Sequence, residues 1–221
     1  MTQLLVPLYE HPADRPEAWA AVLRAPERLY GVILNPASGP GTASDPAFAE
    51  VAGLLRAAGV RVLGYVDTDY ARRPHAAVVA DLLRHRDWYG TDGVFLDQVS
   101  SGPDALAHYR RLAVAARETG ARSLVLNHGV HPDPAYLPLA DVLVTFEGNW
   151  RSYQAQDPVP GWTRAHPADR FCHLVYEAPT DISALAAIRG AAVHCAVPGG
   201  GAHPWGTLPH GLGDQGPGAR G

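Results

Sequence analysis

The sequence predicts an α/β fold, a small (β/α)8 TIM-type barrel with trimmed helices. Eight short apolar runs alternate with segments of helical patterning. Few of the runs alternate strictly between apolar and polar residues, which indicates a parallel sheet buried on both faces. The length of 221 residues is near the lower limit for this fold, so we expect several short helices. The alternative is an open doubly wound sheet, but residues 9–12 after the first run contain no glycine for a dinucleotide fingerprint.

The predicted strands are short and rich in Val, Leu, Ile or aromatic residues. They cover residues 4–9, 30–35, 60–66, 93–97, 123–127, 141–147, 171–176 and 192–196. Helices are expected between them because Pro16 and Pro46 suit a first helical turn, and Gly59, Gly120 and Gly190 suit the position after a last turn. The predicted helices cover residues 15–24, 45–58, 74–88, 103–119 and 181–189. The connections 133–139 and 149–166 show only weak helical patterning.

Residues 1–205 are expected to form one barrel domain, followed by a frayed Gly- and Pro-rich tail over residues 206–221. Cys172 and Cys195 are too few for a disulfide framework, so we expect two reduced, buried thiols.

Composition excludes several classes of function. The net charge of −4 leaves no basic excess for nucleic acid, and no apolar run approaches the roughly 20 residues of a membrane span. All 18 basic residues are Arg, which excludes Schiff-base chemistry, pyridoxal phosphate attachment and a Walker A lysine. We therefore expect no cofactor. The start of the chain, residues 1–7, lacks the basic and long apolar stretches of a secretory signal, so the sequence as given predicts a cytoplasmic protein.

Polar and aromatic residues gather where the predicted strands end, which in a parallel barrel is the face that carries the active site. Carboxylates, amides and aromatic rings together are what a sugar-binding site needs. We therefore expect a carbohydrate substrate. The candidate substrate-binding residues are Tyr9, Asn35, Tyr65, Asp67, Asp69, Gln98, Asn127, Trp150, Tyr176 and Trp205.

Asp97 and Glu147 are the candidate catalytic pair. Each closes a strongly apolar run, a position that a solvated surface charge does not explain. They follow the fourth and sixth strands, whose backbones lie roughly 10 Å apart, and inward side chains could close that gap to the 5–9 Å of glycosidase carboxyl pairs. This estimate does not separate retaining from inverting chemistry.

Four motifs in this order resemble spherulation-specific family 4: residues 32–36 (VILNP), 64–70 (GYVDTDY), 92–97 (DGVFLD) and 145–148 (TFEG). Residues 204–209 (PWGTLP) resemble the segment with which the sequences of that family end. The resemblance implies a small barrel related to bacterial and other microbial endo-glycosidases that cut galactosamine-containing polysaccharides. It also implies Asp97 and Glu147 as the catalytic pair. Relatives in this family are often secreted.

One residue departs from the pattern of the related hydrolases, which often carry Asp-Glu after the fourth strand. This chain has Asp97 followed by Gln98, which can bind a hydroxyl group but cannot ionise. A second hypothesis is therefore a weakened or non-catalytic carbohydrate-binding barrel. A third is a metal-dependent hydrolase, based on His128 and His131 or on Asp67 and Asp69, but we predict no metal site. Sugar, linkage and oligomeric state stay open.

Overall fold

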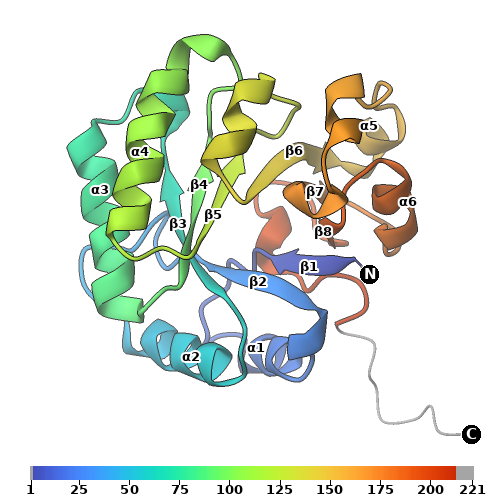
Figure 1. Ribbon diagram of the computed structural model, residues 1–221. Helices are drawn as coiled ribbons and strands as arrows, with labels where there is room; N and C mark the ends of the chain where they lie inside the picture. Colours follow the sequence, from blue (N-terminus) through green and yellow to red (C-terminus); the bar gives the residue numbers. More distant parts are fainter. Residues whose placement is uncertain (1, 213–221) are drawn as a thin grey trace, which may run out of the picture.

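Eight parallel strands close into a barrel in the computed structural model, which describes residues 2–212 (Figure 1). Each strand pairs with the next along the chain, and β1 pairs with β8. The predicted fold class is thus confirmed. The strands are β1 (Gln3–Val6), β2 (Leu29–Leu34), β3 (Val62–Asp67), β4 (Gly93–Asp97), β5 (Ser123–Asn127), β6 (Val142–Asn149), β7 (Phe171–Tyr176) and β8 (Val193–Ala196).

The α-helices of the described residues pack outside the barrel, with α3 and α4 at the left of Figure 1, α1 and α2 at the bottom and α5 and α6 at the right. They are α1 (Pro16–Leu23), α2 (Pro46–Ala57), α3 (His75–Arg84), α4 (Leu106–Glu118), α5 (Trp150–Gln154) and α6 (Ser183–Ile188). Over residues 2–212, none of the helices has both the length and the apolar character that crossing a membrane would need.

One predicted helix and one connection with weak helical patterning differ in detail from regular α-helices. The predicted helix 74–88 ends as a π-helical turn, His85–Tyr89, and the connection 133–139 is a 3-10 helix, Pro134–Leu139. The helices that follow β6 and β7 are one or two turns long. After β6 the chain contains three prolines within residues 158–167, which prevent a longer helix there.

Inward side chains fill the barrel with an apolar core that includes Leu5, Ile33, Phe95 and Val125. Cys172 and Cys195 are free and lie in this core, as expected. They are offset by two residues, since Leu174 rather than Cys172 is the partner of Cys195. A second apolar layer lies between the strands and the helices.

The barrel domain extends beyond residue 205, where the predicted tail was expected to begin. Residues 206–212 still pack on the barrel: the amide of His210 donates to the carbonyl of Ala196 at 2.9 Å, and Leu212 is buried. Leu208 and Leu212 pack into the apolar layer around α1 and α2. The Gly- and Pro-rich composition of this segment gave no indication of that packing. Residues 213–221 lie outside the described residues.

Candidate active site

Asp97 and Asn127 are the last residues of β4 and β5. Each follows by two positions a residue of the barrel core, Phe95 and Val125. Because side chains alternate along a strand, both polar groups face the barrel axis, one layer above the apolar core.

Glu147 reaches the same layer through a β-bulge in β6. Val144 faces the barrel core opposite Cys172, and the register then shifts so that Phe146 pairs with His173 and Glu147 with Leu174. Thr145 is the extra residue. Phe146 consequently packs into the outer apolar layer, and Glu147 turns inward.

The side-chain amide of Asn127 bridges the two carboxyl groups. Its Nδ2 donates to Oδ1 of Asp97 at 2.6 Å and to Oε2 of Glu147 at 2.5 Å. These two oxygens therefore lie no farther apart than the sum of the two bonds, 5.1 Å. Oδ1 of Asn127 accepts from the amide of Gly129 at 3.1 Å, which fixes the orientation of the bridging amide.

The carboxyl group of Asp97 accepts a second hydrogen bond, from the hydroxyl of Tyr65 at 2.7 Å. Burial raises the pKa of Asp97, whereas the donors Tyr65 and Asn127 act in the opposite direction. Burial and the charge of Asp97 also raise the pKa of Tyr65, so this phenol stays a neutral donor. The surroundings of Asp97 thus contain two donors suited to an anion.

Glu147 has a different environment. Burial, with a further contribution from the charge of Asp97, raises the pKa of Glu147 to about 7, against the effect of hydrogen bonds from Asn127 and Trp205. A carboxyl group with this pKa can hold a proton near neutral pH and release it during a reaction. The pair therefore combines a proton donor with a neighbouring carboxylate.

Two cavities open beside this pair. The first, of about 380 Å³, is lined by Tyr70, Asp97, Gln98, Asn127, His128, Gly129 and Glu147. The second, of about 630 Å³, shares Gly129 and Glu147 with the first and extends along β6 and the following loop to Asn149, Asp157 and Tyr176. Glu147 thus contacts both cavities.

Several predicted substrate-binding residues lie at this site. Gln98 lines the first cavity and Tyr176 the second. Tyr9 is half-buried and stands edge-on to Tyr65, with ring centroids 5.7 Å apart. Trp205 is buried in the barrel core, where its side chain donates a hydrogen bond to Glu147 and offers little surface to a ligand.

Seven of the predicted substrate-binding residues line neither cavity: besides Tyr9, Tyr65 and Trp205, these are Asn35, Asp67, Asp69 and Trp150. Asn35 and Asp67 each accept a hydrogen bond from a backbone amide of their own loop, of Gly39 and Asp69 respectively, both at 2.7 Å. Asp69 forms an ion pair with Arg72. Trp150 begins α5 and packs beside Tyr153. Short polar side chains after a strand often satisfy backbone groups of the turn, which explains the positions of Asn35 and Asp67.

Tyr70 was not among the predicted site residues, yet it lines the first cavity with 52% of its surface exposed. The motif of residues 64–70 includes Tyr70, but nothing in that motif indicates that the side chain is exposed. The exposure depends on a left-handed backbone at Asp69, Tyr70 and Ala71, whose φ angles are 45°, 53° and 70°.

The histidines considered for a metal are placed differently from metal ligands. Burial lowers the pKa of His128 to about 4, and its ring packs edge-on against Tyr136 at 4.7 Å. Across residues 2–212, no three His, Cys, Asp or Glu side chains gather in a way that could hold a metal ion.

Known proteins resemble this chain over most of its length. The family model of spherulation-specific family 4 matches residues 3–196. Spherulin-4 of Physarum polycephalum is 34% identical over 150 residues, which are 66% of this chain and 44% of spherulin-4. The chain therefore spans less than half the length of this relative.

Among solved structures, Sph3 of Aspergillus clavatus in complex with GalNAc has a TM-score of 0.77 and 26% identity, over 95% of this chain and 93% of Sph3. A chitinase from Chromobacterium violaceum shares the fold alone, with a TM-score of 0.51 and 16% identity over 79% of this chain and 68% of the chitinase. The protein is thus a TIM barrel similar to Sph3 over 95% of its length, and the match over residues 3–196 shows that the chain belongs to spherulation-specific family 4.

Proposed function

We propose that this protein is a glycoside hydrolase that cleaves a polysaccharide containing an amino sugar. The observation that carries the proposal is the pair Asp97 and Glu147, joined through the amide of Asn127 at the mouth of the barrel. The GalNAc bound to Sph3, the similar structure with 26% identity, supports an amino sugar as the ligand. The resemblance to endo-acting galactosaminidases narrows the proposal to a galactosamine-containing polymer.

The spacing of the pair favours a retaining mechanism. The two bridged oxygens lie no more than 5.1 Å apart. Retaining glycosidases place their carboxyl groups about 5–5.5 Å apart, whereas inverting enzymes leave about 6.5–9.5 Å for a water molecule.

In the first step of this mechanism, Glu147 gives its proton to the glycosidic oxygen while a carboxylate oxygen of Asp97 attacks the anomeric carbon. The bond to the leaving sugar breaks, and a covalent glycosyl ester forms on Asp97. In the second step, Glu147, now ionised, takes a proton from water as the water oxygen displaces Asp97. The raised pKa of Glu147 suits the acid role, and the donors Tyr65 and Asn127 suit the departing carboxylate of Asp97.

The shape of the site supports cleavage within a chain. Because both cavities contact Glu147, sugar units can lie on both sides of the bond that receives its proton. An endo-acting enzyme needs such a site, open in two directions from the cleaved bond.

The test is hydrolysis of a galactosamine-containing polysaccharide, followed by mass spectrometry of the oligosaccharides released. The anomeric configuration of the first product, followed by NMR, distinguishes retention from inversion. Asp97→Asn and Glu147→Gln serve as matched controls because both changes nearly preserve side-chain shape. No release of oligosaccharides by the wild-type protein, or equal release by Asp97→Asn, would refute the hydrolase.

A second candidate function is carbohydrate binding without turnover. Gln98 favours it, because this neutral side chain lines the cavity at the position where related hydrolases often have an acid. This candidate requires that the wild-type protein bind the polysaccharide with no release of products, which the same assay and a binding isotherm would show together.

A further inference from the structure

The first cavity contains one aromatic side chain that is open to solvent. Tyr70 exposes 52% of its surface there, next to the residues of the carboxyl pair. The other aromatic groups near the pair are less available, since Tyr65 and Trp205 are buried and Tyr9 is half-buried. Tyr70 is not part of the buried clusters of residues 2–212, and the cation over its ring is Arg72, so a place in the core does not explain it.

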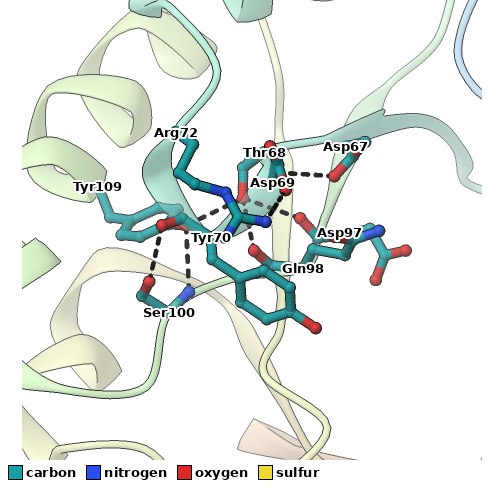
Figure 2. A network of polar contacts seen from close by, with 9 residues as sticks. All are labelled: Asp67, Thr68, Asp69, Tyr70, Arg72, Asp97, Gln98, Ser100 and Tyr109. Atoms are coloured by element: carbon teal, nitrogen blue, oxygen red, sulfur yellow. Dashed lines mark hydrogen bonds and ion pairs between the residues drawn. The ribbon is translucent and has the colours of Figure 1, made fainter.

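The chain adopts an uncommon backbone to hold Tyr70 in this position. Asp69, Tyr70 and Ala71 all have positive φ, a conformation that residues with a side chain rarely adopt even singly. Hydrogen bonds keep the turn in place. The amide of Tyr70 donates to the carbonyl of Gln98 at 2.8 Å, and the hydroxyl of Ser100 donates to the carbonyl of Tyr70 at 3.0 Å (Figure 2).

The turn is also tied to the catalytic strand end. The hydroxyl of Thr68 lies 2.9 Å from the carbonyl oxygens of both Asp97 and Gln98 and 2.9 Å from the hydroxyl of Tyr109. The amide of Thr68 donates to the carbonyl of Asp97 at 3.0 Å. Figure 2 shows this network between the turn and the end of β4. The backbone of Tyr70 is therefore held in a fixed position relative to Asp97.

Arg72 orients the ring from one side. Its guanidinium group lies over the ring of Tyr70, 5.7 Å from the centroid, and forms an ion pair with Asp69 (Figure 2). A cation over one face leaves the opposite face for a ligand. The apolar face of a pyranose ring suits such a surface, because its C–H groups can pack against the negative face of the aromatic system.

We propose that Tyr70 is a stacking platform for a sugar unit of the substrate chain, positioned beside the carboxyl pair by the left-handed turn 69–71. The proposal rests on the proposed function, and it adds a binding residue. Tyr70 contributes affinity for the chain, whereas proton transfer and nucleophilic attack belong to Glu147 and Asp97. The phenol hydroxyl is not needed for this role.

The test compares Tyr70→Asn with Tyr70→Phe, each in the Glu147→Gln background, which keeps the oligosaccharide intact. Asn tolerates positive φ better than Tyr, so Tyr70→Asn removes the ring without straining the turn. Phe keeps the ring and removes only the hydroxyl. Calorimetry with an N-acetylgalactosamine tetrasaccharide gives the dissociation constants, and thermal unfolding shows that each variant is folded.

We expect Tyr70→Asn to raise the dissociation constant about 5- to 10-fold, the size expected for one lost aromatic contact, and Tyr70→Phe to stay within about twofold. With Glu147 restored, Tyr70→Asn should raise KM on polymer by a similar factor and change kcat less. Equal affinity of the Asn variant and its parent would overturn the platform and leave the hydrolase proposal standing. If the Glu147→Gln variant did not bind the tetrasaccharide and the wild-type protein did not cleave the polymer, both proposals would be refuted.

Discussion

Replacing Glu147 with Gln is expected to stabilise the folded protein at pH 8. In the folded protein the pKa of Glu147 is about 7, against an ordinary value of 4.5. Between these two pH values the unfolded chain has lost the proton that the folded chain still holds. The free energy of unfolding therefore falls as the pH rises from 4.5 to 7, and the full loss remains above pH 7.

The size of the effect follows from the shift of about 2.5 pH units between these two pKa values. At 1.36 kcal/mol per unit, ionising Glu147 costs the folded state up to about 3 kcal/mol at pH 8. Gln has nearly the same shape and no charge to bury. For a chain of 221 residues, this corresponds to a melting temperature higher by about 6–12 °C.

The measurement is thermal and urea unfolding of the wild-type protein and Glu147→Gln at pH 4 and pH 8. The gain should be present at pH 8 and nearly absent at pH 4, where both states bind the proton. Glu50→Gln, an exposed position on α2, is the matched control and should change stability little at either pH. A Glu147→Gln variant no more stable than wild type at pH 8, or equally stabilised at pH 4, would refute the reasoning.

Three further predictions concern activity on the proposed substrates. Glu147→Gln should lose about 10²–10⁴-fold on a substrate with a poor leaving group and much less on an activated aryl glycoside, and equal losses on both would reject Glu147 as the acid. Asp97→Asn should be severely impaired on both substrates, and full activity of this variant would refute the proposed mechanism. Asn127→Ala removes a donor that lowers the pKa of both carboxyl groups, so both limbs of the pH profile of kcat/KM should move upward by about one unit. In wild type the alkaline limb should fall near pH 7, and Asn35→Ala, which removes a strand-end amide outside the pair, should leave the profile unchanged.

The barrel could be predicted because buried parallel strands are continuous apolar runs bounded by turns. Each of the eight predicted runs overlaps a strand, and the bounds of β4, β5 and β7 agree with the prediction. The strand ends also located Asp97, Asn127 and Glu147, since parallel strands deliver their last residues to one face.

Other parts of the site depend on information that the pattern of residues does not contain. The orientation of Glu147 depends on a bulge, which arises from the pairing of β6 with β7. The exposure of Tyr70 depends on three left-handed residues without glycine. Trp205 is a predicted substrate-binding residue, but its ring lies in the barrel core, because the chain after β8 folds back over the mouth.

The bulge at Thr145 also affects how relatives of this chain should be aligned. Thr145 is the unpaired residue between Val144 and Phe146, so a strand that lacked it would still place Phe146 outward and the following glutamate inward. A homologue can therefore carry a sixth strand one residue shorter and keep its acid in the same position in space. An ungapped alignment of that strand would match Glu147 with the residue after the true counterpart. Gaps at this point should be set by the glutamate and not by the apolar residues before it.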